Sequence, residues 1–409
     1  MPAIPESLSG EDLRNAVKKA VALLEEVIHD FPFDSEASKT NALAALFTPV
    51  LRDLIPGPVP MAIFDKPQQG TGASLLVDSI SLIATGRPAY MTTPPEGRER
   101  EEEWRKKATS ILLEGRSIVT VDNIEGVLKS AVLGALLTCT YWQDRALGKN
   151  ELISVLHRTT WFVTGNNVRL SGDMPRRCYT VRLDAKRARP WQRDSSKFKH
   201  PNLLEWVKEK RGELLVAIFI LAKAWIAAGR PLPNNLPNLG SFEDWIKIIG
   251  GILAYAGIGG FLENLEEMYD KSEDDDGWEG FLAAWYEKWG EQRITTSEIK
   301  KELAENENLL NSLPGDLDHN DKGFTRRLGH ALKARNGRHF LSGLYIEKSR
   351  TVQKIASWRV RSDESCKLTP GGTGIFGGFD DPEDEADGEY GHEVLKNGDD
   401  YGEGENAPY

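Results

Sequence analysis

The chain has 409 residues, of which 40% are hydrophobic and 28% charged, a balance typical of a globular protein with about two to four domains. Lys223 interrupts the longest apolar stretch, residues 214–228, and this excludes a membrane span. The three cysteines are widely separated and no basic, then apolar leader opens the chain, so we expect a cytoplasmic protein without a disulfide scaffold, a cysteine-based zinc site or a signal peptide.

The net charge of −11 is concentrated in one segment. Residues 371–409 contain twelve acidic residues and one lysine, so they account for the whole net charge, and residues 1–370 sum to zero. A neutral body with basic clusters can bind nucleic acid, so the acidic composition does not exclude DNA as a partner.

The N-terminal part is predicted to be helical. Leu13, Val17, Val21, Leu24 and Ile28 keep the spacing of one helix face, which predicts a helix over residues 8–30. A second helix is expected over residues 36–54. We therefore assign residues 1–58 to an N-terminal helical segment.

Short β-type runs then alternate with helical patterns, which predicts an α/β domain with a mostly parallel sheet over residues 59–230. The expected strands are residues 61–64, 89–92, 117–121, 159–164 and 178–183. The expected helices are residues 74–83, 101–113, 126–138 and 203–229.

The remaining chain is predicted to form three parts. Residues 231–292 read as a helical linker, with helices over 242–290 and an acidic insert at 273–276. Residues 293–362 are expected to form a winged helix, with helices at 296–304 and 323–334 followed by strands at 338–345 and 357–360. The glycine-rich and acidic residues 363–409 are expected to be disordered.

A glycine-rich segment between the first expected strand and the next helix has the context of a phosphate-binding loop. Residues 66–74 read Lys-Pro-Gln-Gln-Gly-Thr-Gly-Ala-Ser. Glycines let backbone N–H groups turn toward an anion, and the following helix points its positive end at the same place. The predicted nucleotide-binding residues here are Gly70, Thr71, Gly72, Ala73 and Ser74, with the Ser74 hydroxyl as a Mg²⁺ ligand.

The lysine of an ordinary P-loop is missing, because Ala73 precedes Ser74, and Pro67 replaces the first glycine. Two interpretations remain open. Either the loop has decayed and does not hydrolyse nucleotide, or Lys66, at the end of the preceding strand, folds back and supplies the ammonium group.

A second element, Ser-Ile-Val-Thr-Val-Asp-Asn over residues 117–123, has the Walker B pattern of a β-branched strand that ends in an acid. Asp122 would hold Mg²⁺, although any buried strand can end in Asp. Asn123 stands where many ATPases have a water-orienting Glu, and it is assigned to the nucleotide site. Glu101, Glu102 or Glu103 could supply that carboxylate, but a solvated helix face is the favoured interpretation of this run.

Two further polar positions follow. Asn166, in the run Thr-Gly-Asn-Asn, could sense the γ-phosphate, or it could belong to a turn. Arg176 and Arg177 precede the fifth expected strand and could reach a neighbouring subunit's nucleotide as an arginine finger, or they could be a surface pair.

Taken together and in this order, the four motifs resemble those of the AAA+ ATPases. They are Gly-Thr-Gly-x-Ser at 70–74, Val-Asp-Asn at 121–123, Thr-Gly-Asn-Asn at 164–167 and Arg-Arg at 176–177. More narrowly, they are similar to the superfamily 3-type helicase modules of phage and plasmid primase–helicases, in a variant form of the loop. The resemblance covers residues 30–230 well and the winged helix loosely. It implies an AAA+ P-loop core, ATP and Mg²⁺ as cofactors, a ring that is most often a hexamer, and catalytic roles for Lys66, Asp122, Asn166 and one of the two arginines.

Two basic regions are candidate DNA contacts. Gly148-Lys149-Asn150 reads as a hairpin turn, and by resemblance Lys149 would be the basic tip in the central pore of the ring; an ordinary solvent hairpin is the alternative. The expected winged helix has a basic face, which suits duplex phosphates or is simply solvated. Its predicted contacts are Arg326, Arg327, Lys333, Arg335 and Arg338. We expect His157 and His200 to be structural, and Trp104, Trp142, Trp161 and Trp191 to be core residues.

These expectations predict an ATP-dependent DNA helicase or replication initiator of a mobile element. DNA would be single-stranded in the pore and duplex at the winged helix, and a separate primase is a candidate partner. Ala73 and Asn123 favour a second reading, a nucleotide-gated DNA-binding initiator with little hydrolysis. A third is a scaffold or loader that recruits another replication protein.

Overall fold

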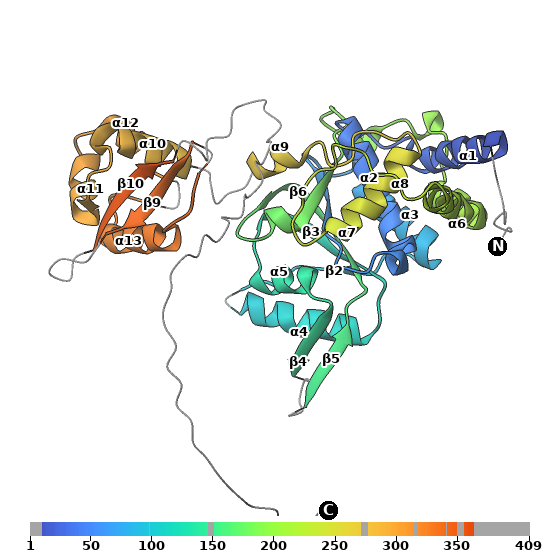
Figure 1. Cartoon of the computed structure of the whole chain (residues 1–409), viewed down its shortest axis with the longest axis horizontal. Coiled ribbons are helices and arrows are strands. Elements are labelled where there is room, and N and C mark those ends of the chain that lie inside the picture. Colours follow the sequence, from blue (N-terminus) through green and yellow to red (C-terminus); the bar gives the residue numbers. More distant parts are fainter. Residues whose placement is uncertain are drawn as a thin grey trace, which may run out of the picture.

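The computed structural model describes residues 10–97, 99–145, 151–270, 277–314, 317–340, 342–349 and 356–363. The acidic insert, the hairpin tip with Lys149 and the predicted disordered tail beyond residue 363 lie outside these residues. Two separate hydrophobic clusters divide the described chain, one within residues 20–268 and one within residues 278–360. Figure 1 shows them as a larger and a smaller lobe.

A five-stranded parallel sheet forms the centre of the larger lobe, which confirms the predicted α/β class. Its order is β2-β3-β6-β1-β7, so the strand before the glycine-rich loop and the strand with Asp122 are separated by β6. All six residues of β1 are buried, as expected for a strand covered on both faces. The bounds are β1 (Met61–Lys66), β2 (Met91–Thr92), β3 (Ile118–Leu128), β6 (Thr160–Leu170) and β7 (Cys178–Arg182).

The predicted N-terminal helices share the hydrophobic cluster of the sheet. Helix α1 (Gly10–Ile28) packs on α6 (Leu203–Ala227), and α2 (Glu36–Val50) packs on β7. The Ser35 side chain caps α2 by accepting a hydrogen bond from the Ser38 N–H at 3.2 Å. A short 3₁₀ turn, η1 (Arg52–Leu54), completes the stretch predicted as one helix.

The crossover helices are α3 (Ala73–Thr85), α4 (Arg100–Leu113) and α5 (Ala131–Thr138). The helix predicted over residues 126–138 is wrong in its first part, because residues 126–128 continue β3. Gly126 has a φ of +77°, which a helix does not allow, and the helix starts only where Ser130 accepts a hydrogen bond from the Leu133 N–H at 3.1 Å. Strand β3 is therefore much longer than the predicted residues 117–121.

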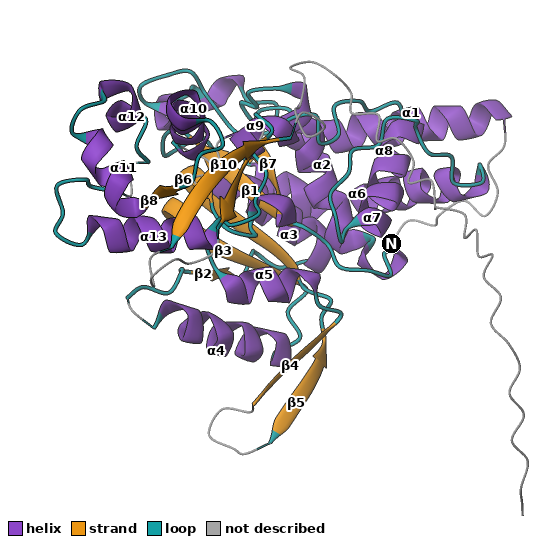
Figure 2. Cartoon of the chain, turned by 60° about the vertical axis from the view of Figure 1, so that its left-hand side comes forward, coloured by secondary structure: helices purple, strands orange, loops and turns teal. Residues whose placement is uncertain are grey.

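The predicted hairpin exists as the antiparallel pair β4 (Tyr141–Arg145) and β5 (Leu152–Leu156), and it projects from the lobe (Figure 2). Its root is fastened to α4 on one face. The Trp142 indole N–H donates to Thr109 Oγ1 at 2.9 Å, and the Thr109 hydroxyl donates to the Asp144 carboxylate at 2.7 Å.

The stretch predicted as helices over 242–290 is interrupted. Gly257 and Gly260 both have positive φ, which a helix does not allow, so the chain is not helical between Tyr255 and Leu265. A short turn, η2 (Pro175–Arg177), comes just before β7. The further elements after β7 include η3 (Pro190–Gln192), η4 (Ser195–Lys197), α7 (Glu243–Trp245), the π-turn η5 (Ile246–Gly250), α8 (Gly251–Tyr255), α9 (Leu265–Asp270) and α10 (Trp278–Trp289).

The smaller lobe combines three further helices with an antiparallel sheet of order β8-β10-β9. Its core contains the tryptophans Trp278, Trp285 and Trp358. The strand predicted at 338–345 is wrong: Gly337 and Gly343 take positive φ, and the strand begins at Leu344. The bounds are β8 (Ile294–Thr295), α11 (Thr296–Leu303), α12 (Glu307–Asn311), α13 (Phe324–Ala334), β9 (Leu344–Lys348) and β10 (Ser357–Ser362).

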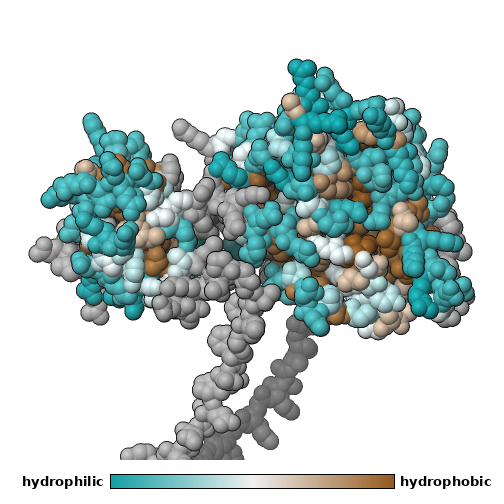
Figure 3. Space-filling model, turned by 90° about the horizontal axis from the view of Figure 1, so that it is seen from above, coloured by the Kyte–Doolittle hydropathy of each residue, from teal (hydrophilic) through white to brown (hydrophobic). Residues whose placement is uncertain are grey.

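The face of this smaller lobe in view in Figure 3 is covered mostly by hydrophilic residues. Within the described residues, none of the helices combines the length and the apolar character that crossing a bilayer requires.

Candidate functional site

The glycine-rich loop joins the buried end of β1 to the start of α3, as predicted. Gly70 and Gly72 have φ of +80° and +100°, so both need the freedom of glycine. Gly72 occupies the N-cap of α3 and no side chain caps this helix end. The first N–H groups of a 13-residue helix therefore face the loop without a protein acceptor, which suits an anion. Ser74 is exposed in the first turn.

Lys66 is the last residue of β1 and only 8% exposed. Burial lowers the pKa of its ammonium group, and the nearby carboxylates of Asp122 and Asp65 oppose that shift. The fold thus holds a buried cation at the entrance to the loop and close to the Walker B acid. Ala73, at the ordinary lysine position, is buried.

Asp122 is oriented by the neighbouring strand. The Thr164 hydroxyl on β6 donates to Asp122 Oδ1 at 2.5 Å, and the Asn123 N–H donates to Thr164 Oγ1 at 3.1 Å. Asn123 has a φ of +59°, in the left-handed region. Thr164 is a site residue that motif reading missed: it lies within the Thr-Gly-Asn-Asn run, but its role becomes visible only from the pairing of β3 with β6.

Asn166 lies between the other two strands of the site. In the strand register it is opposite Lys66 of β1 on one side and Glu125 of β3 on the other. Its side-chain oxygen is buried and has no hydrogen-bond partner among the described residues, and the same holds for the Thr71 hydroxyl in the loop. Orphaned buried polar atoms are costly, and their place at a helix N-terminus beside a lysine and an aspartate fits a bound Mg²⁺-nucleotide.

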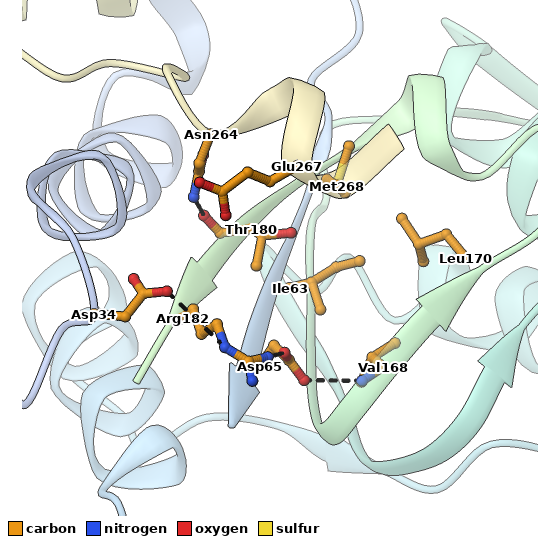
Figure 4. A pocket seen from close by; sticks show the side chains of 10 residues that line it. All are labelled: Asp34, Ile63, Asp65, Val168, Leu170, Thr180, Arg182, Asn264, Glu267 and Met268. Atoms are coloured by element: carbon orange, nitrogen blue, oxygen red, sulfur yellow. Dashed lines mark hydrogen bonds and ion pairs between the residues drawn. The ribbon is translucent and has the colours of Figure 1, made fainter. Parts of the chain in front are cut away.

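The second asparagine of the Thr-Gly-Asn-Asn run, Asn167, already has a hydrogen-bond partner in a network around Asp65 and Arg182. Asp65 points to the opposite face of the sheet, where it forms an ion pair with Arg182 and accepts the Val168 N–H at 2.8 Å (Figure 4). Arg182 also donates to Asn167 Oδ1 at 3.2 Å. These contacts of Asp65 and Arg182 hold the chain at Asn167. Of the two asparagines, Asn166 is therefore the one whose side chain is available to bind a ligand.

The two arginines predicted as finger candidates differ in their surroundings. Arg177 is 12% exposed at its side chain, ion-paired to Asp173 at 2.9 Å and packed against Gly134 of α5. Arg176 is 63% exposed at its side chain and paired only with the exposed Asp173 at 2.6 Å. Arg176 is therefore the one at the surface.

The three glutamates of α4 are engaged elsewhere. Glu101 accepts hydrogen bonds from the Ser130 hydroxyl and the Val132 N–H, both at 3.0 Å, and so it caps α5. Glu102 and Glu103 pair with Lys106 on the exposed face of α4. The predicted solvated helix face therefore describes Glu102 and Glu103, and Glu101 has a structural role at α5.

One tryptophan prediction is wrong. Trp104, Trp142 and Trp161 are core residues, but Trp191 is 62% exposed and lies against the loop. A Cβ built on Gly70 would come within 2.9 Å of Trp191 Cβ. The glycine at position 70 thus allows close packing of η3 on the glycine-rich loop as well as the loop's own conformation.

His157 is structural, as expected. Its ring lies between Trp161, whose indole N–H donates to Nε2 at 3.1 Å, and the Cys139 carbonyl, 3.3 Å from Nδ1. Burial lowers the pKa of His157 to about 4, which keeps the ring neutral. His200 lies 2.8 Å from Glu26 and stacks on Trp206.

The cations predicted to contact duplex DNA fall into two groups. Arg326 and Lys333 are exposed on α13, on the side opposite the buried Phe324, Leu328 and Leu332. The others are engaged: Arg327 pairs with Asp321 at 2.5 Å, Arg335 lies 4.3 Å over the Trp278 ring, and Arg338 lies 5.5 Å from the Phe340 ring centre.

No protein-family model matches the chain, and no curated protein matches it. Two solved structures are similar over most of their length. The apo A form of the NrS-1 C-terminal region has 13% identity and a TM-score of 0.37, covering 88% of this chain and 83% of that one. A second structure, of residues 305–718 of the same region, has 12% identity and a TM-score of 0.38, covering 87% of this chain and 79% of that one.

Proposed function

We propose that this protein is an ATP-dependent DNA motor of replication, a helicase or initiator of a mobile element, that acts as a ring in the cytoplasm. The observation that carries the proposal is the convergence of three side chains on three adjacent strands, beside an uncapped helix N-terminus: Lys66 at the end of β1, Asn166 opposite it on β6, and Asp122 on β3. Ligands of open α/β sheets bind at this edge.

The residues have distinct roles in this proposal. The loop N–H groups and the Lys66 ammonium group hold the β- and γ-phosphates. Lys66 takes the role of the lysine that directly precedes the serine in an ordinary P-loop, where this chain has Ala73. Ser74 and Asp122 hold Mg²⁺ together with phosphate oxygens, a ligand set of the kind Mg²⁺ takes, and the bound ion would offset charge on the phosphates. Asn166 contacts the γ-phosphate, and the exposed Arg176 reaches the nucleotide of the next subunit.

DNA would be held at two places. Lys149 at the hairpin tip is the proposed contact to single-stranded DNA in the ring, through charge and without sequence preference. The smaller lobe would act as a winged helix, with Arg326 and Lys333 on α13 contacting duplex phosphates. A separate primase is a fitting partner for such a motor.

The test is ATP hydrolysis measured with and without single-stranded DNA. We expect DNA-stimulated turnover in the wild type, its loss in Lys66→Ala and no requirement for Ala73→Lys. Lys208→Ala is the matched control, because Lys208 is an exposed lysine paired with Glu205 on α6. A folded wild type that binds ATP without any turnover would contradict the motor.

A second candidate is a nucleotide-gated initiator that assembles on DNA without processive unwinding. Asn123 favours it, since an amide at this position cannot take a proton from water. It predicts DNA binding that depends on ATP, with negligible turnover and no strand displacement. A loader or scaffold would instead show weak DNA affinity and a stable protein partner.

A further inference from the structure

The proposed reaction needs a carboxylate that the sequence motifs do not supply. The residue after Asp122 is an amide, and the side chain of Glu101 is committed to the N-terminus of α5. Glu102 and Glu103 share Lys106 on the outer face of α4. A candidate must lie on the same face of the sheet as Asp122 and at the level of the γ-phosphate contact.

The strand register brings Glu125 to that position. Lys66, Asn166 and Glu125 form one row across β1, β6 and β3, because Asn166 is opposite each of the other two. Paired residues of parallel strands share a face, and residues two apart on one strand do too. Asn166 therefore faces the same side as Thr164, whose hydroxyl binds Asp122. Glu125, Lys66 and Asp122 lie on this side.

Two irregularities in the pairing produce this row. Between the pairs of Val121 and Ile124, β3 has one residue more than β6, and beyond Glu125 the extra residue is on β6. Such bulges re-aim side chains and are common next to active sites. Without the first bulge, the simple alternation of β3 would place Glu125 on the face opposite to Asp122.

Close packing holds the bulge in place. A Cβ on Gly165 would come within 2.5 Å of the Ile124 carbonyl oxygen, so only glycine lets β6 approach the bulged strand. Asn123 takes its left-handed conformation here and its side-chain N–H donates weakly to Glu125 Oε1, at 3.4 Å. The amide that interrupts the Walker B motif thus has a structural partner in the glutamate two residues on.

The Glu125 carboxylate is also accessible. It is exposed, and it lines a pocket of about 440 Å³ together with Asp122 and Asn123. Within the described residues it has no ion pair with a lysine or arginine. The pocket gives a water molecule access to the Glu125 carboxylate beside Asp122.

We propose, on the basis of the proposed function, that Glu125 is the catalytic base of ATP hydrolysis, with Asn123 as its positioning residue. The water oxygen bonds to the γ-phosphorus while the bond from that phosphorus to the bridging oxygen of the ADP leaving group breaks. The proton of the water passes to the Glu125 carboxylate and from there to solvent. The products are ADP and inorganic phosphate, and the step needs no further reactant.

The test compares Glu125→Gln with Glu96→Gln, a control that removes an exposed carboxylate lining the same pocket. For Glu125→Gln we expect DNA-stimulated ATP turnover to fall by about 10²- to 10⁴-fold, the contribution of a general base. The dissociation constant for Mg²⁺-ATP and the thermal midpoint should stay at wild-type values. Glu96→Gln should keep turnover within about threefold of the wild type.

A shorter carboxylate adds a readout that a purely structural role would not move. Glu125→Asp keeps a carboxylate and should retain part of the turnover, whereas Glu125→Gln keeps the size of the side chain and should lose it. Glu125→Gln turnover within about threefold of the wild type, at unchanged affinity, overturns the assignment. A wild type that binds ATP without hydrolysing it also overturns it, whereas a wild type that binds no ATP overturns the proposed function itself.

Discussion

The two lobes place their charges in different ways. In the larger lobe Arg52, Asp65 and Lys66 are buried, and the last two lie at the end of the strand that leads into the phosphate loop. In the described part of the smaller lobe no charged side chain is buried, and its cations are exposed, paired with acids or stacked on rings. Burying a charge is costly, so a buried lysine at a strand end indicates a functional demand that a basic surface does not.

The largest effect that sharpens this contrast is expected at Lys66. Lys66→Met should lower ATP turnover by about 10²- to 10³-fold, as for loss of one preorganised charge contact. Its thermal midpoint should not fall, because a buried cation is replaced by an apolar side chain of similar length. Lys208→Met on α6 is the matched control, because Lys208 is an exposed lysine outside the proposed site, and it should leave turnover unchanged. A strongly destabilised Lys66→Met would mean that the lysine serves the fold.

The pH dependence of stability should come from the larger lobe. The unfolded chain titrates His157 near pH 6.5, but its folded pKa is about 4, so between these values the unfolded state binds the extra proton. The unfolding free energy of this lobe should therefore fall by about 3 kcal/mol as the pH drops through this window. Urea unfolding at several pH values measures it.

The control for this window is His330→Gln, at an exposed histidine on α13, which should keep the wild-type profile. His157→Gln should flatten the profile between pH 4 and 6.5. An unchanged pH profile in His157→Gln would show that other groups cause the loss.

The phosphate loop should be sensitive to a single methyl group. Gly70→Ala forces a left-handed conformation on alanine, at about 1–2 kcal/mol, and also pushes a Cβ against Trp191. Gly97→Ala has the same type of conformation, φ +85°, but no atom within 4 Å of the new Cβ. Isothermal titration with Mg²⁺-ATP should therefore show a larger loss of affinity for Gly70→Ala, and equal losses would exclude the packing contribution.

The smallest effects are expected on the smaller lobe. Arg326→Ala with Lys333→Ala should weaken binding to random-sequence duplex DNA a few-fold and lower the salt dependence by about one unit for each lost phosphate contact. Arg359→Ala is the control, since this guanidinium already pairs with Glu347 at 2.7 Å. Fluorescence anisotropy over a salt series measures both the affinity and its salt dependence. If Arg359→Ala weakened binding as much as Arg326→Ala and Lys333→Ala do, the division into exposed and engaged cations would be refuted.

The α/β class and the glycine-rich turn between β1 and α3 were predictable because both depend on local signals. Alternating β-type and helical runs mark the strands, and Gly70 and Gly72 are glycines that the loop conformation requires. The bulge at Asp122 and Asn123 was not predictable, since it depends on which residue of β6 lies opposite, and this is why the strand was expected to end at Val121. Glu125 was missed for the same reason.

The basic residues of the smaller lobe show a second reason why sequence-based prediction of the DNA contacts was incomplete. A count of arginines and lysines along the sequence cannot tell that Arg335 lies over Trp278 or that Arg327 pairs with Asp321, because both contacts depend on tertiary packing. Trp191 was predicted to be a core residue but is exposed, and the sequence around it agrees with exposure, since it follows Pro190 in an arginine-rich segment with no apolar periodicity.

The anchored root of the hairpin has a mechanical consequence. Trp142 and Asp144 are both hydrogen-bonded to Thr109, and Arg105 adds an ion pair to Asp144 at 3.4 Å, so strand β4 is fastened to helix α4 at three side chains. Glu101, on the same helix, is joined to the start of α5, directly after the strand with Asp122. The described part of the hairpin is thus coupled through α4 to the start of α5, so a rotation of these two helices would carry β4 with it.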